Sequence, residues 1–299
     1  MAGTGKKKKS IRRRLIIIAV ALVAVVALVV VYFVQANIAA SAEKGTTIVK
    51  IGVDSDSDDD IWDAVNTTLA KENAKIKVKL VKMDGTTIND ATVKKEVDLN
   101  AFQHRAYLND QIDQHGYKLD VFANTIIQPM NVYSDKIKSL DELKSGDTVA
   151  VPDNATNLGR ALKVLESAGV ITTDPAKGYL PTVSDITKNP KHIKIVQVDA
   201  YQIPRVLPDN TAGILNANVA VDAGLNPAKD SIYSVKINSE DVYNKPWTNI
   251  IVGRKGDESN PVYRKVVEAY GSTAVKKVIE KSHSKDMVYV YKNLLKSSK

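Results

Sequence analysis

Three side chains that could take part in chemistry lie close together in the stretch VDLNAFQHRAYL (97–108). His104 stands between Phe102 and Tyr107, in a chain that holds three Phe and four His. A histidine can act as a general base, but the chain has no cysteine to serve as nucleophile and no G-x-S-x-G motif. The other histidines do not have the spacing of zinc ligands. We therefore predict a core or pocket histidine, with no catalytic residue, no metal ligand and no cofactor.

A second candidate is the stretch NATNLGRAL (154–162). Asn157 or Thr156 could cap a helix here, and Gly159 would let a ligand approach the backbone closely. Arg160 would then lie in the first turn, where free amides, the helix dipole and a guanidinium together suit a carboxylate. The alternative is an ordinary capped helix with a solvated arginine.

Two asparagines occur at apolar strands. Asn216 follows the strand-like run AGIL, and Asn249 lies within TNIIV. A buried asparagine must find hydrogen-bond partners, which can be backbone groups or a ligand.

The acidic run DSDSDDD (54–60) has a superficial likeness to a calcium-binding loop. An EF-hand requires Gly at its sixth position and Glu at its twelfth, whereas counting from Asp54 these positions are Asp59 and Val65. Carboxylates at 58–60 fit the positive N-terminus of the helix that follows. Calcium binding stays open, and some of these carboxylates could instead face an ammonium group of a ligand.

The elements that must position these residues alternate along the chain. IVKIGVD, KIKVKLVKM and KLDVFANT have strand patterns with helix-like segments between them, and DTVAVP followed by a helix repeats the rhythm, which predicts an α/β fold with parallel strands. In such sheets ligands bind beyond the carboxyl ends of the strands. We expect one shared cleft there, lined by Asp54, His104, Asn154, Asn157 and Asn216.

The N-terminus predicts a membrane segment. Residues 15–34 are apolar and uncharged, and as a helix they would span ~30 Å, the thickness of a bilayer core. The basic tail 1–14 should stay cytoplasmic, which places the rest outside. We expect a signal-anchor at 15–34 and a linker at 35–46; the alternative is a signal peptide cleaved near Ala42.

The net charge of +8 belongs mostly to this tail. Seven of the 42 basic residues lie within 1–14, so 35 basic side chains face 34 acidic ones in the remaining 285 residues. That balance offers no electrostatic reason to expect nucleic-acid binding.

Long ordered stretches carry a family resemblance. DLNAFQHRAYL, IKSLDELKSGDTVAVPDNATNLGRALKVLESAGVI, LNPAKDSIY and TNIIV resemble the NlpA/MetQ family of methionine-binding components of ABC importers, over roughly residues 49–270. The resemblance implies a type II periplasmic-binding-protein fold: two α/β lobes, a hinge crossed twice and a ligand between them. The lobes would be 47–128 with 246–299, and 129–245.

The resemblance also implies a ligand-binding set. In that family aromatic residues and a histidine line the side-chain pocket, an arginine holds the ligand carboxylate, and asparagines hold the amino-acid backbone. The matching positions, with Asn157 beside the arginine, are Phe102, His104, Tyr107, Asn157, Arg160, Asn216 and Asn249.

Three departures from the family pattern bear on the ligand. The lipidated N-terminal cysteine is absent and an apolar segment stands in its place. The Gly-Pro turn after the first strand is replaced by DSDSDDD. Two pocket positions that are aromatic in the family fall near Thr86 and at Gln128.

We therefore expect an extracytoplasmic binding protein, not an enzyme. Its ligand would be an amino acid, with methionine the leading candidate, or a short peptide, and its partners an ABC permease and its cytoplasmic ATPase. The alternatives are a surface protein of the same fold with an altered ligand or no transport role, and a hydrolase that uses His104.

Overall fold

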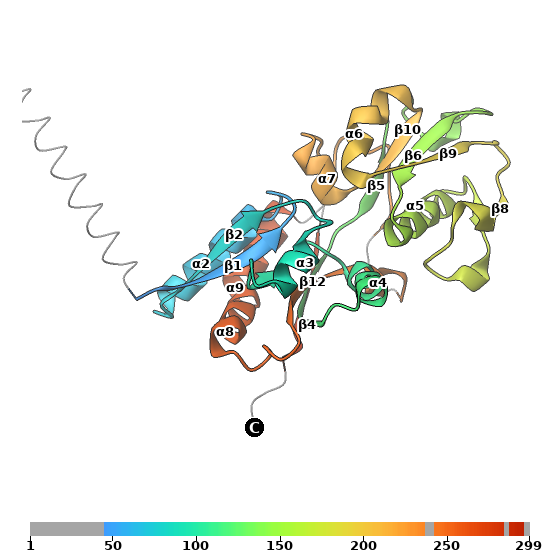
Figure 1. Ribbon diagram of the computed structural model, residues 1–299. Coiled ribbons are helices and arrows are strands. Elements are labelled where there is room, and N and C mark those ends of the chain that lie inside the picture. The colour runs from blue at the N-terminus through green and yellow to red at the C-terminus, as the bar shows by residue number, and fades with distance from the viewer. Residues whose placement is uncertain (1–44, 237–241, 284–286, 296–299) are drawn as a thin grey trace, which may run out of the picture. The chain divides into compact units, whose positions relative to one another are not determined.

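The structure is a computed structural model that describes residues 45–236, 242–283 and 287–295 (Figure 1). One compact unit spans 48–299. The expected membrane segment 15–34, the tail 1–14 and nearly all of the linker 35–46 lie outside the described residues. Within the described part, no helix is long and apolar enough to cross a membrane.

The first sheet has six strands in the order β13-β4-β12-β3-β1-β2. Its strands come from both ends of the folded unit: β1 (Thr47–Val53), β2 (Ile76–Lys82), β3 (Leu99–Asn100), β4 (Leu119–Ile127), β12 (Thr248–Arg254) and β13 (Val288–Asn293). The helices associated with it are α2 (Asp59–Lys71), α3 (Ile88–Val93), α4 (Arg105–His115), α8 (Pro261–Tyr270) and α9 (Thr273–Ser282).

The expectation of parallel strands holds only in part for the first sheet. β1 pairs with β3 in parallel, but β12 lies between β3 and β4 and is antiparallel to both. β3 and β4 therefore do run in the same direction, as the strand–helix alternation predicts. They are not neighbours, because a strand from the C-terminal part of the chain is inserted between them.

The second sheet has five strands in the order β11-β5-β10-β6-β9. They are β5 (Met130–Tyr133), β6 (Thr148–Pro152), β9 (Lys194–Val198), β10 (Ala212–Asn216) and β11 (Tyr233–Ser234), with a separate hairpin of β7 (Thr172–Thr173) and β8 (Ile186–Lys188). Helices α5 (Ala155–Ser167), α6 (Ile203–Val206) and α7 (Ala217–Asp222) accompany it. Short 3-10 helices include η4 (Ala200–Gln202) and η6 (Val242–Trp247).

Each sheet is buried on both faces. In the first, α2, α8 and α9 contribute to one apolar cluster that includes Trp62 and Tyr270, while Leu108 of α4 packs against Leu119 and Val252. In the second, α5 packs in a cluster with β6, and Tyr133 lies in another with residues of α6 and α7. The carboxyl ends of β1, β3, β6 and β10 are left to carry loops and helix N-termini, where polar side chains can meet.

Candidate functional site

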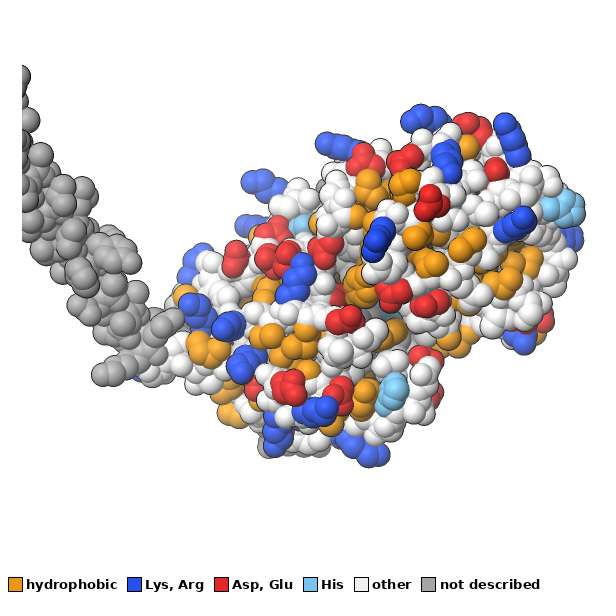
Figure 2. Space-filling view, turned by 45° about the horizontal axis from the view of Figure 1, so that its top comes forward, with side chains coloured by type: hydrophobic (Ala, Val, Ile, Leu, Met, Phe, Trp, Pro, Cys, Tyr) orange, Lys and Arg blue, Asp and Glu red, His pale blue; other side chains and the backbone are white. Residues whose placement is uncertain are grey.

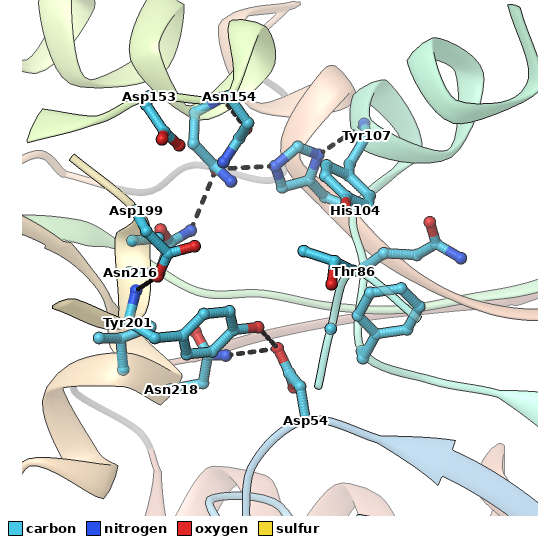
Figure 3. Close-up of a pocket in the computed structure, with 16 residues that line it drawn as sticks. Asp54, Thr86, His104, Tyr107, Asp153, Asn154, Asp199, Tyr201, Asn216 and Asn218 are labelled. Atoms are coloured by element: carbon cyan, nitrogen blue, oxygen red, sulfur yellow. Dashed lines mark hydrogen bonds between the residues drawn. The ribbon is translucent and has the colours of Figure 1, made fainter. Parts of the chain in front are cut away.

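A cavity of about 110 Å³ lies between residues of the two sheets (Figure 3). The first sheet and its helices contribute Asp54, Thr86, Phe102, His104 and Tyr107, and the second half contributes Asn154, Asn157, Asn216, Asn218 and Tyr201, among others. All five residues that we expected in one cleft from their places after strands therefore line the same cavity.

His104 is both the cap of α4 and part of the cavity wall. Its Nδ1 accepts the backbone N–H of Tyr107 at 3.1 Å, so the ring proton is on Nε2, which donates to Asn157 Oδ1 at 3.1 Å. Burial and the nearby Arg160 guanidinium lower the pKa of His104 to about 3. The ring is therefore neutral, with both nitrogens engaged, and cannot act as a general base in this arrangement.

Two asparagines continue the hydrogen-bonded chain. Asn157 Oδ1 also accepts from Asn216 Nδ2 at 3.1 Å. Asn216 Oδ1 is buried and has no hydrogen-bond partner among the described residues. Because a buried amide oxygen without a donor is costly, this oxygen is a site for a donor from outside the protein, such as an ammonium group.

The cap of α5 differs from our expectation. Asn154, not Asn157 or Thr156, caps the helix and accepts the N–H of Asn157 at 3.0 Å. Arg160 therefore lies in the second turn rather than the first. The expected role of Gly159 is also wrong: a Cβ there would lie 2.6 Å from the Tyr179 carbonyl oxygen, so the glycine serves helix packing and not ligand approach.

Arg160 lies behind the cavity wall. It is 8% exposed, donates from Nη2 to the carbonyl of Gln128, and stacks over the Trp247 ring at 5.2 Å. No carboxylate pairs with it among the residues that the structure describes. Burial lowers its pKa to about 9. A buried guanidinium without a counter-ion favours an anionic ligand group.

The aromatic wall is formed by Phe102 and Tyr107. Their rings meet edge to face at 6.1 Å, and Tyr107 meets the His104 ring at 6.3 Å. Both side chains are partly exposed, unlike the buried His104. They leave apolar ring surface available to a bound side chain.

Asn249 borders a second, smaller cavity of about 20 Å³. Its Nδ2 donates to Gln128 Oε1 at 3.2 Å, and Gln128 Nε2 lies 3.4 Å from Asp58 Oδ1. Asp54, Phe102 and Asn218 line both cavities, so the two adjoin. The structure thus brings Phe102, His104, Tyr107, Asn157 and Asn216 to the main cavity, and places Asn249 beside it and Arg160 behind it.

Sequence reasoning left out two residues that complete the site. Tyr201 in η4 donates its hydroxyl to Asp54 Oδ2 at 2.7 Å, and Asn218 in α7 donates to the same oxygen at 2.9 Å. Gly85 leaves room for this hydroxyl, because a Cβ there would collide with it. Burial raises the pKa of Asp54 to about 7, although the Tyr201 hydrogen bond opposes the rise. The bonds join the first sheet to the second, which no local pattern could indicate.

A buried amide network supports the wall that carries His104. Gln103 and Asn89 exchange hydrogen bonds of 2.6 and 3.0 Å, and Gln103 also donates to Asn100 at 2.9 Å. Asn100 donates to Thr92 at 2.8 Å. These side chains are at most 3% exposed. The polar residues of LNAFQH are therefore partly a scaffold for the cavity.

The acidic run begins a helix. Asp58 is the N-cap of α2, and Asp59 and Asp60 lie in its first turn. Among the described residues, no group of three or more His, Asp or Glu is arranged to hold a metal ion.

Known proteins match nearly the whole described chain. The family described as NlpA lipoprotein matches residues 49–291. The D-methionine-binding lipoprotein MetQ of Yersinia pestis is 40% identical over 236 residues, covering 78% of this chain and 84% of that protein. A nutrient binding protein from Burkholderia cenocepacia bound to methionine matches with a TM-score of 0.74 at 38% identity, covering 81% of this chain and 99% of that one. The crystal structure of the methionine binding protein MetQ gives a TM-score of 0.76 at 37% identity, covering 82% and 99%.

Proposed function

The chain belongs to the NlpA lipoprotein family, and from this premise we propose that it is the extracytoplasmic substrate-binding component of an ABC importer for an amino acid. The family resemblance read from the sequence is confirmed, and the fold is the mixed α/β substrate-binding fold with two sheets. Methionine is the leading ligand, since related proteins are named for binding it.

The observation that carries the proposal is the presence of two incomplete polar groups, one in the wall of the cavity and one behind that wall. Arg160 is a buried cation without a carboxylate, and Asn216 Oδ1 is a buried acceptor without a donor, both within the described residues. A free amino acid supplies a carboxylate and an ammonium group from one carbon atom. Binding would thus satisfy both groups, once the Arg160 side chain turns from the Gln128 carbonyl toward the ligand.

Two lobes that close on the ligand would explain the position of the cavity. We propose lobes of 47–128 with 246–299, and 129–245, with Gln128 and Pro129 as one of two hinge crossings between β4 and β5. The second crossing would run through 235–247, a stretch that includes residues outside the described ones. Closure around a ligand is the usual motion of such proteins.

The route to the membrane is also a proposal. Relatives are named lipoproteins, yet this sequence has no cysteine to carry a lipid. We propose that residues 15–34 anchor the protein instead, with the folded unit outside and an ABC permease with its cytoplasmic ATPase as partner.

A hydrolytic role for His104 has no support in the site. One ring nitrogen accepts a helix N–H and the other donates to Asn157, so neither is free to take a proton from water. The family is one of substrate-binding proteins.

Thermal-shift screening of the full-length protein against amino acids and dipeptides tests the proposal. A ligand at about 100 times its dissociation constant should stabilise the protein by about 2.7 kcal/mol. Arg160→Ala should abolish the shift for every ligand, because the carboxylate loses its charged partner. Arg205→Ala, which removes an exposed arginine of α6 that does not line the cavity, is the control and should leave the shift unchanged.

Two outcomes would contradict the proposal. If no amino acid or dipeptide stabilises the protein, it is a surface protein that keeps the fold without the importer role. If Arg160→Ala leaves the shift intact, the assignment of the carboxylate to Arg160 is wrong.

A further inference from the structure

We infer that the cavity selects an amino acid whose side chain ends in a positive charge, and that Asp54 is the residue that binds this charge. The inference rests on the proposed function and names the class of ligand within it. Within that function it ranks a cationic ligand above methionine, whose thioether is neutral.

The first step is the charge of the cavity walls. Five carboxylates line the two adjoining cavities: Asp54, Asp58, Asp59, Asp153 and Asp199. Among the described residues that line them there is no lysine and no arginine, and the one histidine is neutral. Figure 2 shows acidic side chains around the hollow in this face of the molecule. Such walls attract cations and raise their local concentration.

The second step is that Asp54 lacks a cation of its own. Its two side-chain donors, Tyr201 and Asn218, are neutral, and it takes part in no ion pair among the described residues. Nearby Lys82 is already paired with Asp56 at 2.8 Å and Asp222 at 3.4 Å. The raised pKa of Asp54 agrees with this, because a carboxylate next to a cation would be shifted the other way.

The third step is the place of Asp54 in the cavity. In Figure 3 it lies at the opposite end from His104, with Thr86 at the side between them. An amino acid whose carboxylate and ammonium are held near His104 would extend its side chain toward Asp54. The rings of Phe102 and Tyr107 line this path, and aromatic faces stabilise a cation as well as an apolar chain.

A simpler role for Asp54 is to hold the two halves together through Tyr201. Two variants separate that role from ligand recognition. Asp54→Asn keeps an oxygen that can accept from the Tyr201 hydroxyl but removes the charge. Tyr201→Phe removes the hydrogen bond but keeps the charge.

Isothermal titration calorimetry on the full-length protein in detergent tests the inference. L-Methionine and S-methyl-L-methionine are the main pair, because they differ by one methyl group and the positive charge that it creates on sulfur. L-Ornithine and L-lysine extend the test to ammonium groups. We expect the sulfonium compound to bind at least ~10-fold more tightly than methionine, a difference of about 1.4 kcal/mol.

The two variants should affect the preference for the cationic ligand differently. Asp54→Asn should remove it, so that the affinities for L-methionine and S-methyl-L-methionine become equal within about threefold. Tyr201→Phe should weaken all ligands by a similar factor and keep the preference.

Three outcomes would overturn the inference, and they are distinguishable. If methionine binds and all the cationic compounds bind more weakly, the inference fails and the proposed function stands. If a cationic compound binds best but Asp54→Asn keeps the preference, Asp54 is not its partner. If no amino acid binds, the proposed function fails and the inference with it.

Discussion

The two ends of the cavity differ in the hydrogen bonding and the charge of their polar side chains. At the amide end, His104, Asn157 and Asn216 are joined by hydrogen bonds of 3.1 Å, and each group has a set direction. At the acidic end, Asp54 is held by neutral donors, and the carboxylates of Asp58 and Asp222 lie near it. Amides in fixed positions suit the carboxylate and ammonium groups that every amino acid shares. A carboxylate without a cation suits the side chain, in which amino acids differ. We therefore expect the amide end to recognise amino acids as a class and the acidic end to select among them.

The largest expected effect concerns the amide end. Asn157→Ala leaves the His104 Nε2–H and the Asn216 amide without their shared acceptor, so affinity should fall by about 2 kcal/mol, or ~30-fold. The loss should be equal for methionine and S-methylmethionine. Asn218→Ala, at the acidic end, is the matched asparagine and should change the ratio of the two affinities. Calorimetry with both ligands measures these affinities. If Asn157→Ala lowers the two affinities by different factors, the proposed separation of roles between the two ends is wrong.

An effect of similar size, on stability and not on affinity, is expected in the scaffold beneath the amide end. Asn100→Ala removes a buried side chain that bonds Thr92 and Gln103, so the free energy of unfolding should fall by roughly 2 kcal/mol. Chemical denaturation measures it. The exposed Gln114→Ala is the control and should stay within about 0.5 kcal/mol of the parent protein. Equal stabilities of the two variants would mean that the network does not support the cavity.

The last effect is a pH dependence of stability that differs between the two ends of the cavity. Because the pKa of Asp54 is raised from 3.8 to about 7, the folded state holds this proton more tightly, and Asp54 adds stability as pH falls from 7 toward 4. His104 has the opposite sign: its pKa is lowered from 6.5 to about 3, so stability is lost as pH falls below 6.5. In the parent protein the two contributions partly cancel.

The variant Asp54→Asn removes the contribution of Asp54 to this pH dependence, so comparison with the parent protein measures that contribution. The ligand-free parent should gain about 3 kcal/mol relative to this variant between pH 7 and pH 4, measured by denaturation. The groups facing Asp54 are Tyr201, Asp58 and Asp222. The pKa of Asp58 is also raised by burial, but Asp58 is present in both proteins, so its own contribution cancels in the comparison. A difference that does not vary with pH would contradict the buried state of Asp54.

Much of the amide end could be predicted from the sequence because its residues follow strand ends. His104, Asn157 and Asn216 each come after an apolar run, and the carboxyl ends of these runs meet. The position of Arg160 was harder, since it depends on Asn154 being the cap and on Trp247, 87 residues further along the chain, covering the guanidinium. The identity of the family came from long matched stretches and not from any single motif.

The partners of Asp54 could not be predicted from the sequence. Its place after the first strand put it in the expected cleft, but the donors to its carboxylate, Tyr201 and Asn218, lie more than 140 residues further along the chain. The insertion of β12 between β3 and β4 is likewise a long-range pairing. Local sequence periodicity predicts neither the partners of Asp54 nor the position of β12.

The bond between Arg160 and the main chain of Gln128 has a consequence for how such a protein can diversify. The guanidinium is held by the carbonyl oxygen at position 128, a group that every amino acid possesses. The side chain at the same position points to Asn249 and Asp58 at the smaller cavity. A substitution at position 128 therefore changes the lining of the smaller cavity but keeps the main-chain oxygen that accepts from Arg160. Descendants of one ancestral protein can in this way differ at position 128 while all keep the main-chain contact that holds Arg160.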